Sequence, residues 1–139
     1  MIPARVLHEM VSKGGIPRSI IYLSAVCSSH CDIGLGTIVL SGVVINPEVH
    51  IEQNFNLNTN SSIDHHCNLG NHVHICPVAN FAGYVTVVDN FMIGTGVALL
   101  PGITISNNCI IPAGAVVICD IAGYFVVVRN PAKLIWKLN

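Results

Sequence analysis

An apolar side chain recurs at every sixth position of this chain, without a break, from residue 33 to residue 117. A six-residue repeat is set neither by the 3.6-residue helix period nor by strand alternation alone. A hexapeptide repeat predicts a parallel β-helix, in which three hexads form one triangular coil of about 18 residues. Each residue should then lie over the residue 18 positions earlier. The fifteen positions are Ile33, Val39, Ile45, Ile51, Leu57, Ile63, Leu69, Ile75, Phe81, Val87, Ile93, Leu99, Ile105, Ile111 and Val117.

A second set of inward positions follows each apolar position by four residues. Its members are mostly small or β-branched, as strands that converge on a narrow core require. Turn-forming Gly, Pro, Asn and Asp residues lie between the two sets. A β-sandwich of short strands is the alternative, but its turns would come at irregular intervals of roughly 8–12 residues. The second set is Thr37, Val43, Val49, Phe55, Ser61, Cys67, Val73, Ala79, Val85, Phe91, Val97, Ile103, Cys109, Ala115 and Ile121.

The two ends of the chain depart from the repeat. Residues 5–13 predict a short amphipathic helix that ends at Gly14 and Gly15. Residues 124–128 predict a strand, and a tail follows it. We therefore divide this all-β chain into a helix-like lead-in at 1–22, a β-helix of about five coils at 23–125, and a strand and tail at 126–139.

Composition narrows the classes of function. The 139 residues suit one domain, and a 52% hydrophobic, 9% charged composition suggests that assembly buries further surface. A net charge of −1 argues against a nucleic-acid partner. We find neither an apolar run of membrane-spanning length nor a signal peptide. The six cysteines contain no C-x-x-C pair, so we interpret them as reduced thiols of a cytoplasmic protein.

The 18-residue rule predicts three corners of different chemistry. One is polar throughout. A second is built of small residues and should leave a shallow groove where a ligand can approach the backbone. At the third, His65 should lie exposed between Pro47 and Gly83, which are too small to cover it, as an active site requires. The second corner includes Gly94, Thr95, Gly96, Pro112, Ala113 and Gly114.

His65 and His74 are nine residues apart and should face different sides of one prism. They can share a site only if another copy brings its small-residue corner against His65. A closed ring of three identical chains would do this and create three equivalent clefts.

Several segments together resemble one family. They are residues 62–70 (Ser-Ile-Asp-His-His-Cys-Asn-Leu-Gly), 72–75, 82–83, 93–96 and 130–133, in that order. Over about residues 20–139 the chain resembles the sugar O-/N-acetyltransferases typified by the sialic acid O-acetyltransferase and the bacterial UDP-4-amino-sugar N-acetyltransferases. The resemblance implies a left-handed β-helix, a homotrimer, and acetyl-CoA bound between subunits.

Carried over by position, the resemblance also implies roles for individual residues. His65 would be the general base, with His66 at the position of its usual acidic partner. His74 would contact the thioester region of acetyl-CoA. Thr95 and Ala113 would line the pantetheine groove beside Gly94. The coenzyme's anionic end would favour three cations near the C-terminus, Arg129, Lys133 and Lys137.

The chain departs from the family pattern in two ways. Family members carry an N-terminal nucleotide-sugar domain, of which only a remnant at about residues 4–22 is expected here, and there is no G-x-G-x-x-G motif. His66 replaces an acid, and a neutral imidazole cannot stabilise an imidazolium as a carboxylate does. Glu48 should stack beneath His66, which would permit a relay through His66.

The sequence thus predicts an acetyl-CoA-dependent acetyltransferase that acts on an amine or hydroxyl of a sugar. Two other classes remain open. One is a non-catalytic or truncated β-solenoid. The other is a metal lyase of the γ-carbonic anhydrase type, in which histidines converge on zinc, although the expected His-x4-His spacing is missing. We assign no residue to a metal site.

Overall fold

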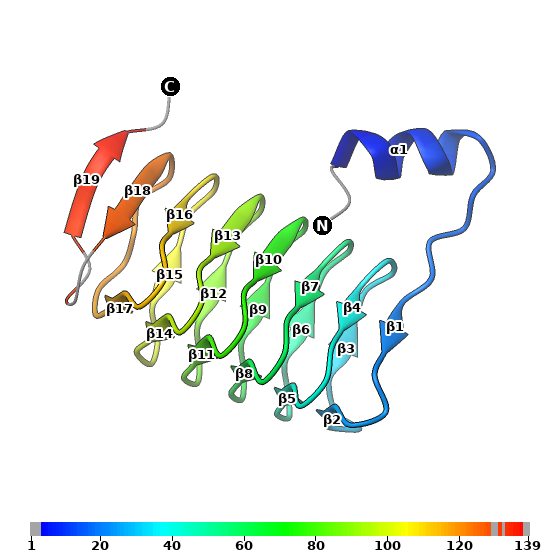
Figure 1. Ribbon diagram of the computed structural model, residues 1–139, viewed down its shortest axis with the longest axis horizontal. Coiled ribbons are helices and arrows are strands. Elements are labelled where there is room, and N and C mark those ends of the chain that lie inside the picture. The colour runs from blue at the N-terminus through cyan, green and yellow to red at the C-terminus, as the bar shows by residue number, and fades with distance from the viewer. Residues whose placement is uncertain (1–3, 129–130, 132, 138–139) are drawn as a thin grey trace.

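In the computed structural model, which describes residues 4–128, 131 and 133–137, the chain winds into a triangular β-helix (Figure 1). Three sheets of parallel strands form its sides, and successive strands along the chain pass from one sheet to the next. The strands are two to four residues long within the coils, because a corner interrupts the chain at every sixth residue.

Up to β17, the strands of each sheet come from every third segment of the chain, and β18 and β19 then extend the eight-stranded sheet. The eight-stranded sheet contains β1 (Ile20–Ile21), β4 (Ile38–Val39), β7 (Asn56–Leu57), β10 (Val73–Ile75), β13 (Phe91–Ile93), β16 (Ile110–Ile111), β18 (Phe125–Val128) and β19 (Lys133–Lys137). The six-stranded sheet contains β2 (Val26–Cys27), β5 (Val44–Ile45), β8 (Ser62–Ile63), β11 (Asn80–Phe81), β14 (Ala98–Leu99) and β17 (Val116–Val117). The five-stranded sheet contains β3 (Asp32–Ile33), β6 (His50–Ile51), β9 (Asn68–Leu69), β12 (Thr86–Val87) and β15 (Thr104–Ile105).

The 18-residue register is confirmed through the coils. Ile63 pairs with Phe81, and Leu69 pairs with Val87. The last coil is an exception, because Ile121 pairs with Ile105 rather than lying over Ile103. The chain there completes its turn two residues early, which shifts β18 onto β16 by the same amount.

The predicted core is confirmed as well. Every predicted inward position from Thr37 to Ile121 is buried. Ile33, nearer the start of the β-helix, is partly buried and packs against this core. Ser61 is a polar member of the core, and its hydroxyl donates to the Asn58 carbonyl at 2.7 Å.

The corners are two-residue turns whose second residue has a positive φ. Glycine occupies this position in several coils, but Asn, His, Tyr and even Val occupy it in others, with φ between 54° and 66°. This conformation costs an L-residue about 1–2 kcal/mol relative to glycine. The left-handed turn is therefore imposed by the coil and not by local preference alone.

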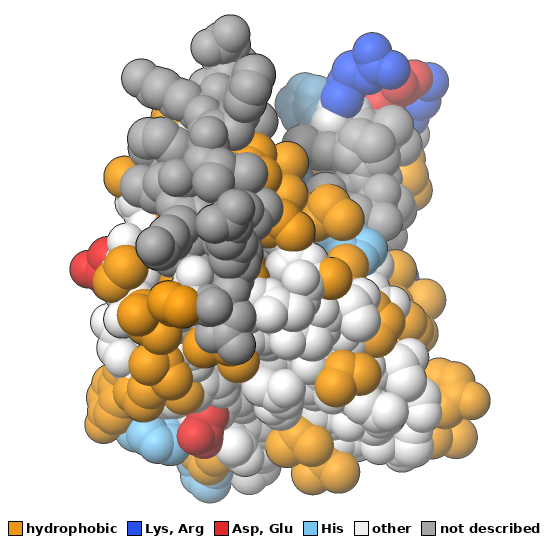
Figure 2. Space-filling model, turned by 60° about the vertical axis from the view of Figure 1, so that its left-hand side comes forward, with side chains coloured by type: hydrophobic (Ala, Val, Ile, Leu, Met, Phe, Trp, Pro, Cys, Tyr) orange, Lys and Arg blue, Asp and Glu red, His pale blue; other side chains and the backbone are white. Residues whose placement is uncertain are grey.

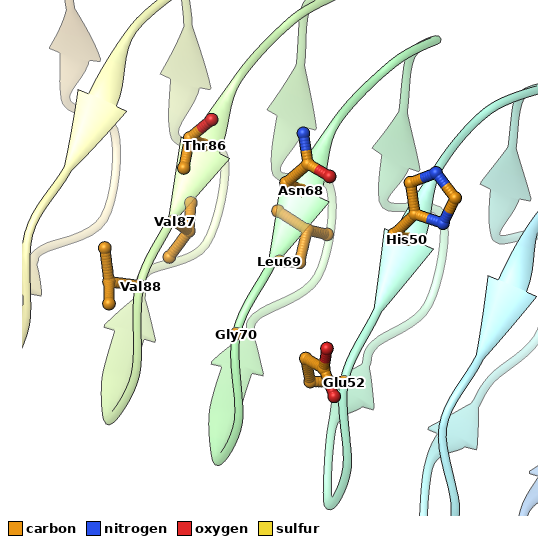
Figure 3. A pocket seen from close by; sticks show the side chains of 8 residues that line it. All are labelled: His50, Glu52, Asn68, Leu69, Gly70, Thr86, Val87 and Val88. Carbon is orange, nitrogen blue, oxygen red and sulfur yellow. The ribbon is translucent and has the colours of Figure 1, made fainter.

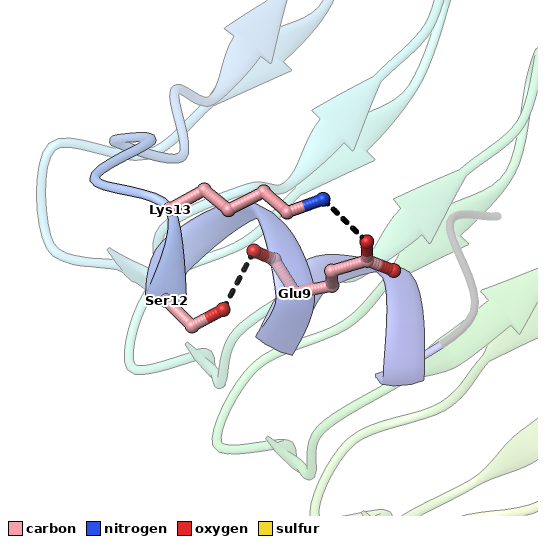
Figure 4. A network of polar contacts seen from close by, with 3 residues as sticks. All are labelled: Glu9, Ser12 and Lys13. Carbon is pink, nitrogen blue, oxygen red and sulfur yellow. Dashed lines mark hydrogen bonds and ion pairs between the residues drawn. The ribbon is translucent and has the colours of Figure 1, made fainter.

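The helix α1 (Ala4–Ser12) agrees with the predicted helix to within one residue. It ends where the Gly14 and Gly15 amides donate to carbonyls of its last turn. Lys13 pairs with Glu9 at 2.6 Å, and the Ser12 hydroxyl donates to the Glu9 carbonyl at 2.8 Å (Figure 4). A hollow of about 200 Å³ separates the end of α1 from β1 and β4. No helix among the described residues has the length and apolar content that crossing a bilayer requires.

The C-terminal part confirms the predicted strand as β18. The tail, which the sequence did not assign to an element, forms β19, antiparallel to β18. Charged side chains are sparse on the coil surface, and hydrophobic side chains are spread over it (Figure 2).

Candidate active site

His65 lies in the corner that joins β8 to β9, and the preceding residue holds this turn in place. Asp64 Oδ1 accepts a hydrogen bond from the His65 backbone N–H at 2.8 Å and another from Asn46 Nδ2 at 2.9 Å. The bond from the His65 N–H is the main cause that lowers the pKa of Asp64. The Asn46 bond and the attraction of a charge on His65 add to it, and partial burial opposes it. Asp64 thus orients the turn, and its carboxylate does not bond to the His65 ring.

The His65 ring packs on the backbone of Gly83 in the next coil. A Cβ atom at Gly83 would come within 2.6 Å of His65 Cε1, 2.9 Å of Nε2 and 3.0 Å of Nδ1. The predicted stacking of His65 against Gly83 is confirmed, and Pro47 is in the coil on the other side, where its carbonyl accepts from the His66 N–H. His65 is partly buried, however, and less exposed than we expected.

Two aromatic neighbours account for this burial. His65 Nδ1 lies 3.1 Å from His66 Nδ1, within hydrogen-bonding distance. The Tyr84 ring meets the His65 ring edge-on at 5.2 Å and stacks on the His66 ring at 4.8 Å with a 22° interplanar angle. Sequence reasoning did not assign Tyr84 to the site, although the 18-residue rule places it directly over His66.

A relay from Glu48 through His66 is not formed. Among the described residues the ion pairs are Lys13–Glu9 and His50–Asp32, and Glu48 is in neither. Glu48 is exposed at the edge of the corner. The stacking of positions 48 and 66 is correct, but an exposed carboxylate gains little from pairing in water.

His74 occupies a separate part of the molecule, as predicted. It lies in β10 on the outer face of the eight-stranded sheet, between Asn56 and Met92. The Asn58 amide nitrogen is 3.1 Å from the Ile75 carbonyl and 3.0 Å from His74 Nε2. A carbonyl can only accept, so the amide nitrogen donates to both. His74 Nε2 is therefore an acceptor, Nδ1 carries the proton, and burial lowers the pKa of the ring.

The small-residue corner follows β10 and β13 and is open in part. A Cβ atom at Gly96 or Gly114 would meet nothing within 4 Å, and Thr95 and Ala113 are exposed. Gly94 is different, because it is buried and a Cβ there would come within 2.4 Å of the Ala113 nitrogen. Gly94 allows the coils to pack closely and does not line the surface. His74 precedes this corner by only a few residues, on the adjoining face.

A shallow hollow of about 220 Å³ lies on the five-stranded sheet (Figure 3). Sequence reasoning did not find it, because its lining comes from three coils. Asn68 lines it and begins the strand after the His65 corner, so the hollow adjoins that corner. The lining residues are His50, Glu52, Asn68, Leu69, Gly70, Thr86, Val87 and Val88.

The histidines do not converge within one chain. His72 bonds to Asn54 at 2.8 Å in the polar corner, away from both His65 and His74. No group of three His, Cys, Asp or Glu side chains in the described part of the chain could hold a metal ion. Of the three predicted C-terminal cations, Arg129 lies outside the described residues. Lys133 and Lys137 bound β19, and the structure describes only their backbone.

Comparisons with known proteins place this geometry in a family, although the chain matches no protein-family model. It is 34% identical over 113 residues to GDP-perosamine N-acetyltransferase of Escherichia coli O157:H7, covering 81% of this chain and 51% of that protein. The chain therefore spans about half the length of this relative.

Two solved structures share the fold closely. PerB from Caulobacter crescentus, in complex with CoA and GDP-perosamine, gives a TM-score of 0.94 at 32% identity over 95% of this chain and 64% of that chain. The acetyltransferase domain of PglB from Neisseria gonorrhoeae gives 0.94 at 29% identity over 96% and 65%. These likenesses confirm the left-handed β-helix. In sequence and in fold, the chain is homologous to these hexapeptide-repeat acetyltransferases.

Proposed function

We propose that this chain transfers an acetyl group from acetyl-CoA to an amine or hydroxyl of a sugar, with His65 as the general base. The observation that carries the proposal is the His65 ring, which is fixed on Gly83 and whose Nδ1 faces His66. No hydrogen bond joins Nε2 to another described residue, so this nitrogen is available to a substrate. The relative named GDP-perosamine N-acetyltransferase, and PerB in its complex with CoA and GDP-perosamine, support the reaction class.

The chemistry requires one proton to move as one bond forms. The acceptor nitrogen or oxygen attacks the thioester carbonyl carbon while His65 Nε2 removes its proton. General base catalysis of this kind accelerates a reaction by about 10²–10⁴-fold. The resulting tetrahedral oxyanion needs a donor. His74, with its proton on Nδ1, has such a donor in its neutral form. Collapse breaks the carbon–sulfur bond, and the leaving thiolate recovers the proton from the His65 imidazolium.

His65 and His74 lie on different parts of one chain, so the proposed site needs a second copy. We propose a homotrimer in which the small-residue corner of one copy meets the His65 corner of the next. The six-stranded sheet connects these two corners, and Val26, Leu100 and Ile118 expose 64%, 44% and 51% of their surface there. Apolar side chains of this exposure favour burial by a partner. Thr95 and Ala113 would then line the acetyl-CoA groove, with Gly94 shaping it.

The acceptor and the compartment belong to the same proposal. An amino sugar, free or nucleotide-linked, and a sialic acid are the two acceptor classes. All six cysteines are free thiols, which suits the reducing cytoplasm.

A thiol-release assay tests the function. Acetyl-CoA is incubated with the protein and a panel of GDP-perosamine, other amino sugars and sialic acids. We expect CoA release with one acceptor class, and a loss of about 10²-fold or more in His65→Ala. His65→Ala should still bind acetyl-CoA in calorimetry. Full activity in this variant would refute the assignment of the base, and no acetyl-CoA binding by the unaltered protein would favour a non-catalytic solenoid. A monodisperse monomer in light scattering at micromolar concentration would refute the trimer.

A further inference from the structure

Tyr84 occupies a corner position whose backbone conformation suits glycine better than other residues. It is the second residue of its corner, with φ of 62°, and 59% of its surface is exposed. The equivalent position one coil on is Gly102, with φ of 73°. An L-residue in this conformation costs about 1–2 kcal/mol relative to glycine. Nine other non-glycine residues in the described part of the chain share this conformation, so strain alone does not explain a largely exposed aromatic ring beside a candidate catalytic residue, and the reason must come from its contacts.

The contacts of the ring supply that reason. Tyr84 stacks on His66 at 4.8 Å and touches His65 edge-on at 5.2 Å, and the Tyr84 N–H donates to the His65 carbonyl at 2.9 Å. Stacked and edge-on aromatic pairs are each worth about 0.5–1.5 kcal/mol beyond the area that they bury. The Tyr84 ring therefore restricts the rotation of His66, whose own side chain is exposed.

We propose that Tyr84 is a positioning residue that acts through His66. By holding His66, it keeps His66 Nδ1 against His65 Nδ1, so that His65 carries its proton on Nδ1 and presents an unprotonated Nε2. Only one of two nitrogens 3.1 Å apart can carry the shared proton. If His66 donated instead, the neutral His65 ring would carry its proton on Nε2 and could not act as a base there. The choice of His65 as the donor rests on the proposed function, because the distance between the two Nδ1 atoms fits either direction; the contact of Tyr84 with His66 does not rest on it.

The neutral His65–His66 pair performs part of the role that a carboxylate beside a catalytic histidine has in other enzymes. A carboxylate beside a histidine fixes the ring tautomer and stabilises the imidazolium. His66 performs the first task by accepting from His65 Nδ1–H. The same bond serves the second. The His65 imidazolium would donate a stronger, charge-assisted bond to His66 than the neutral ring does.

Nitrogen-15 NMR of histidine-labelled protein tests the tautomer without any acceptor. Tyr84→Phe keeps the stacked ring and is the matched control. Tyr84→Gly removes the ring, and its left-handed φ suits glycine, so this variant should fold at least as well. We expect the Nδ1–H tautomer at His65 in the unaltered protein and in Tyr84→Phe. In Tyr84→Gly we expect a mixture with the Nε2–H form that free histidine prefers in water.

Steady-state kinetics provide the second test of the proposal. Turnover should fall about 10-fold or more in Tyr84→Gly, with an unchanged KM for acetyl-CoA, and should stay within about two-fold in Tyr84→Phe. An Nε2–H tautomer at His65 in the unaltered protein, or an unchanged tautomer in Tyr84→Gly, would overturn the proposal. If the tautomer responds as expected but His65→Ala is fully active, the positioning role stands and the proposed function fails.

Discussion

Gly83→Ala should separate activity from stability at the candidate site. The added methyl would lie 2.6 Å from His65 Cε1, whereas ordinary contacts begin at about 3.4 Å. The imidazole must therefore retreat by roughly 0.8 Å or rotate. Because the atoms in the way belong to a partly buried side chain and not to backbone, the coil itself can stay in place.

The expected magnitudes differ for the two measurements. Misplacing a catalytic group by about 1 Å costs about 10²-fold in rate. Gly83 does not have a left-handed φ, so alanine is compatible with its backbone. Reduced freedom of the unfolded chain then contributes about 0.4–1 kcal/mol, which offsets the cost of moving the ring. We expect turnover to fall about 10²-fold while the free energy of unfolding changes by less than about 1 kcal/mol.

Gly102→Ala is the control, since it adds the same methyl to the same corner one coil on, although at the position equivalent to Tyr84. A Cβ there would meet nothing within 4 Å, but the φ of 73° disfavours it. This variant should lose about 1 kcal/mol of stability and keep its activity. Thiol release and urea unfolding measure the two effects. Unaltered turnover in Gly83→Ala would show that the packing of the ring on Gly83 does not set the position of the base.

Four further changes test other parts of the structure. Val78 is a β-branched residue at an unfavourable φ of 61°, so Val78→Gly should raise the free energy of unfolding, measured in urea, by about 1 kcal/mol. A decrease would show that the left-handed turn does not strain this residue. Ala113→Phe should weaken acetyl-CoA binding at least about 10-fold in calorimetry with an unchanged melting temperature, whereas unchanged affinity would move the groove elsewhere. His66→Glu keeps an acceptor beside His65 and adds an anion, so turnover should stay the same or rise; lost activity in a folded protein would give the imidazole a role of its own. Burial lowers the pKa of His74, so as the pH falls below about 6.5 the unfolded state binds the proton first, and stability should fall until the lowered pKa is passed. His74→Gln should flatten this slope in urea unfolding, and an unchanged slope would assign it to another group.

The repeat fixed most of the fold in advance because one physical rule governs every coil. An apolar residue at each sixth position sets the inward direction, and the 18-residue stack follows from it. The rule failed where the coil changed length, at Ile121, since nothing in the repeat marks a turn two residues shorter. It also did not reveal β19, whose pairing with β18 depends on a reversal after the last coil.

The sequence predicted which residues of the candidate site lie over one another in successive coils, but not the contacts of their side chains. Stacking placed His65 against Gly83 and separated it from His74. It did not show that Asp64 caps the turn or that Asn58 fixes the His74 tautomer, because both depend on side-chain rotamers. Gly94 was assigned to the groove surface, and the structure shows that it is a packing residue. A glycine can leave space for a ligand or for the neighbouring coil, and the sequence pattern is the same in both cases.

The geometry around His65 depends on two adjacent residues of the next coil. Gly83 provides the surface on which the ring lies, and Tyr84 provides the ring that holds His66. Gly83 follows His65 by 18 positions, and Tyr84 follows His66 by the same number. The geometry of the proposed base therefore depends on a turn that is distant in sequence. A substitution at position 83 or 84 therefore alters the site while leaving the His-His segment intact. The presence of that segment alone is thus weaker evidence for catalysis in related chains than its occurrence together with a glycine 18 residues after the base.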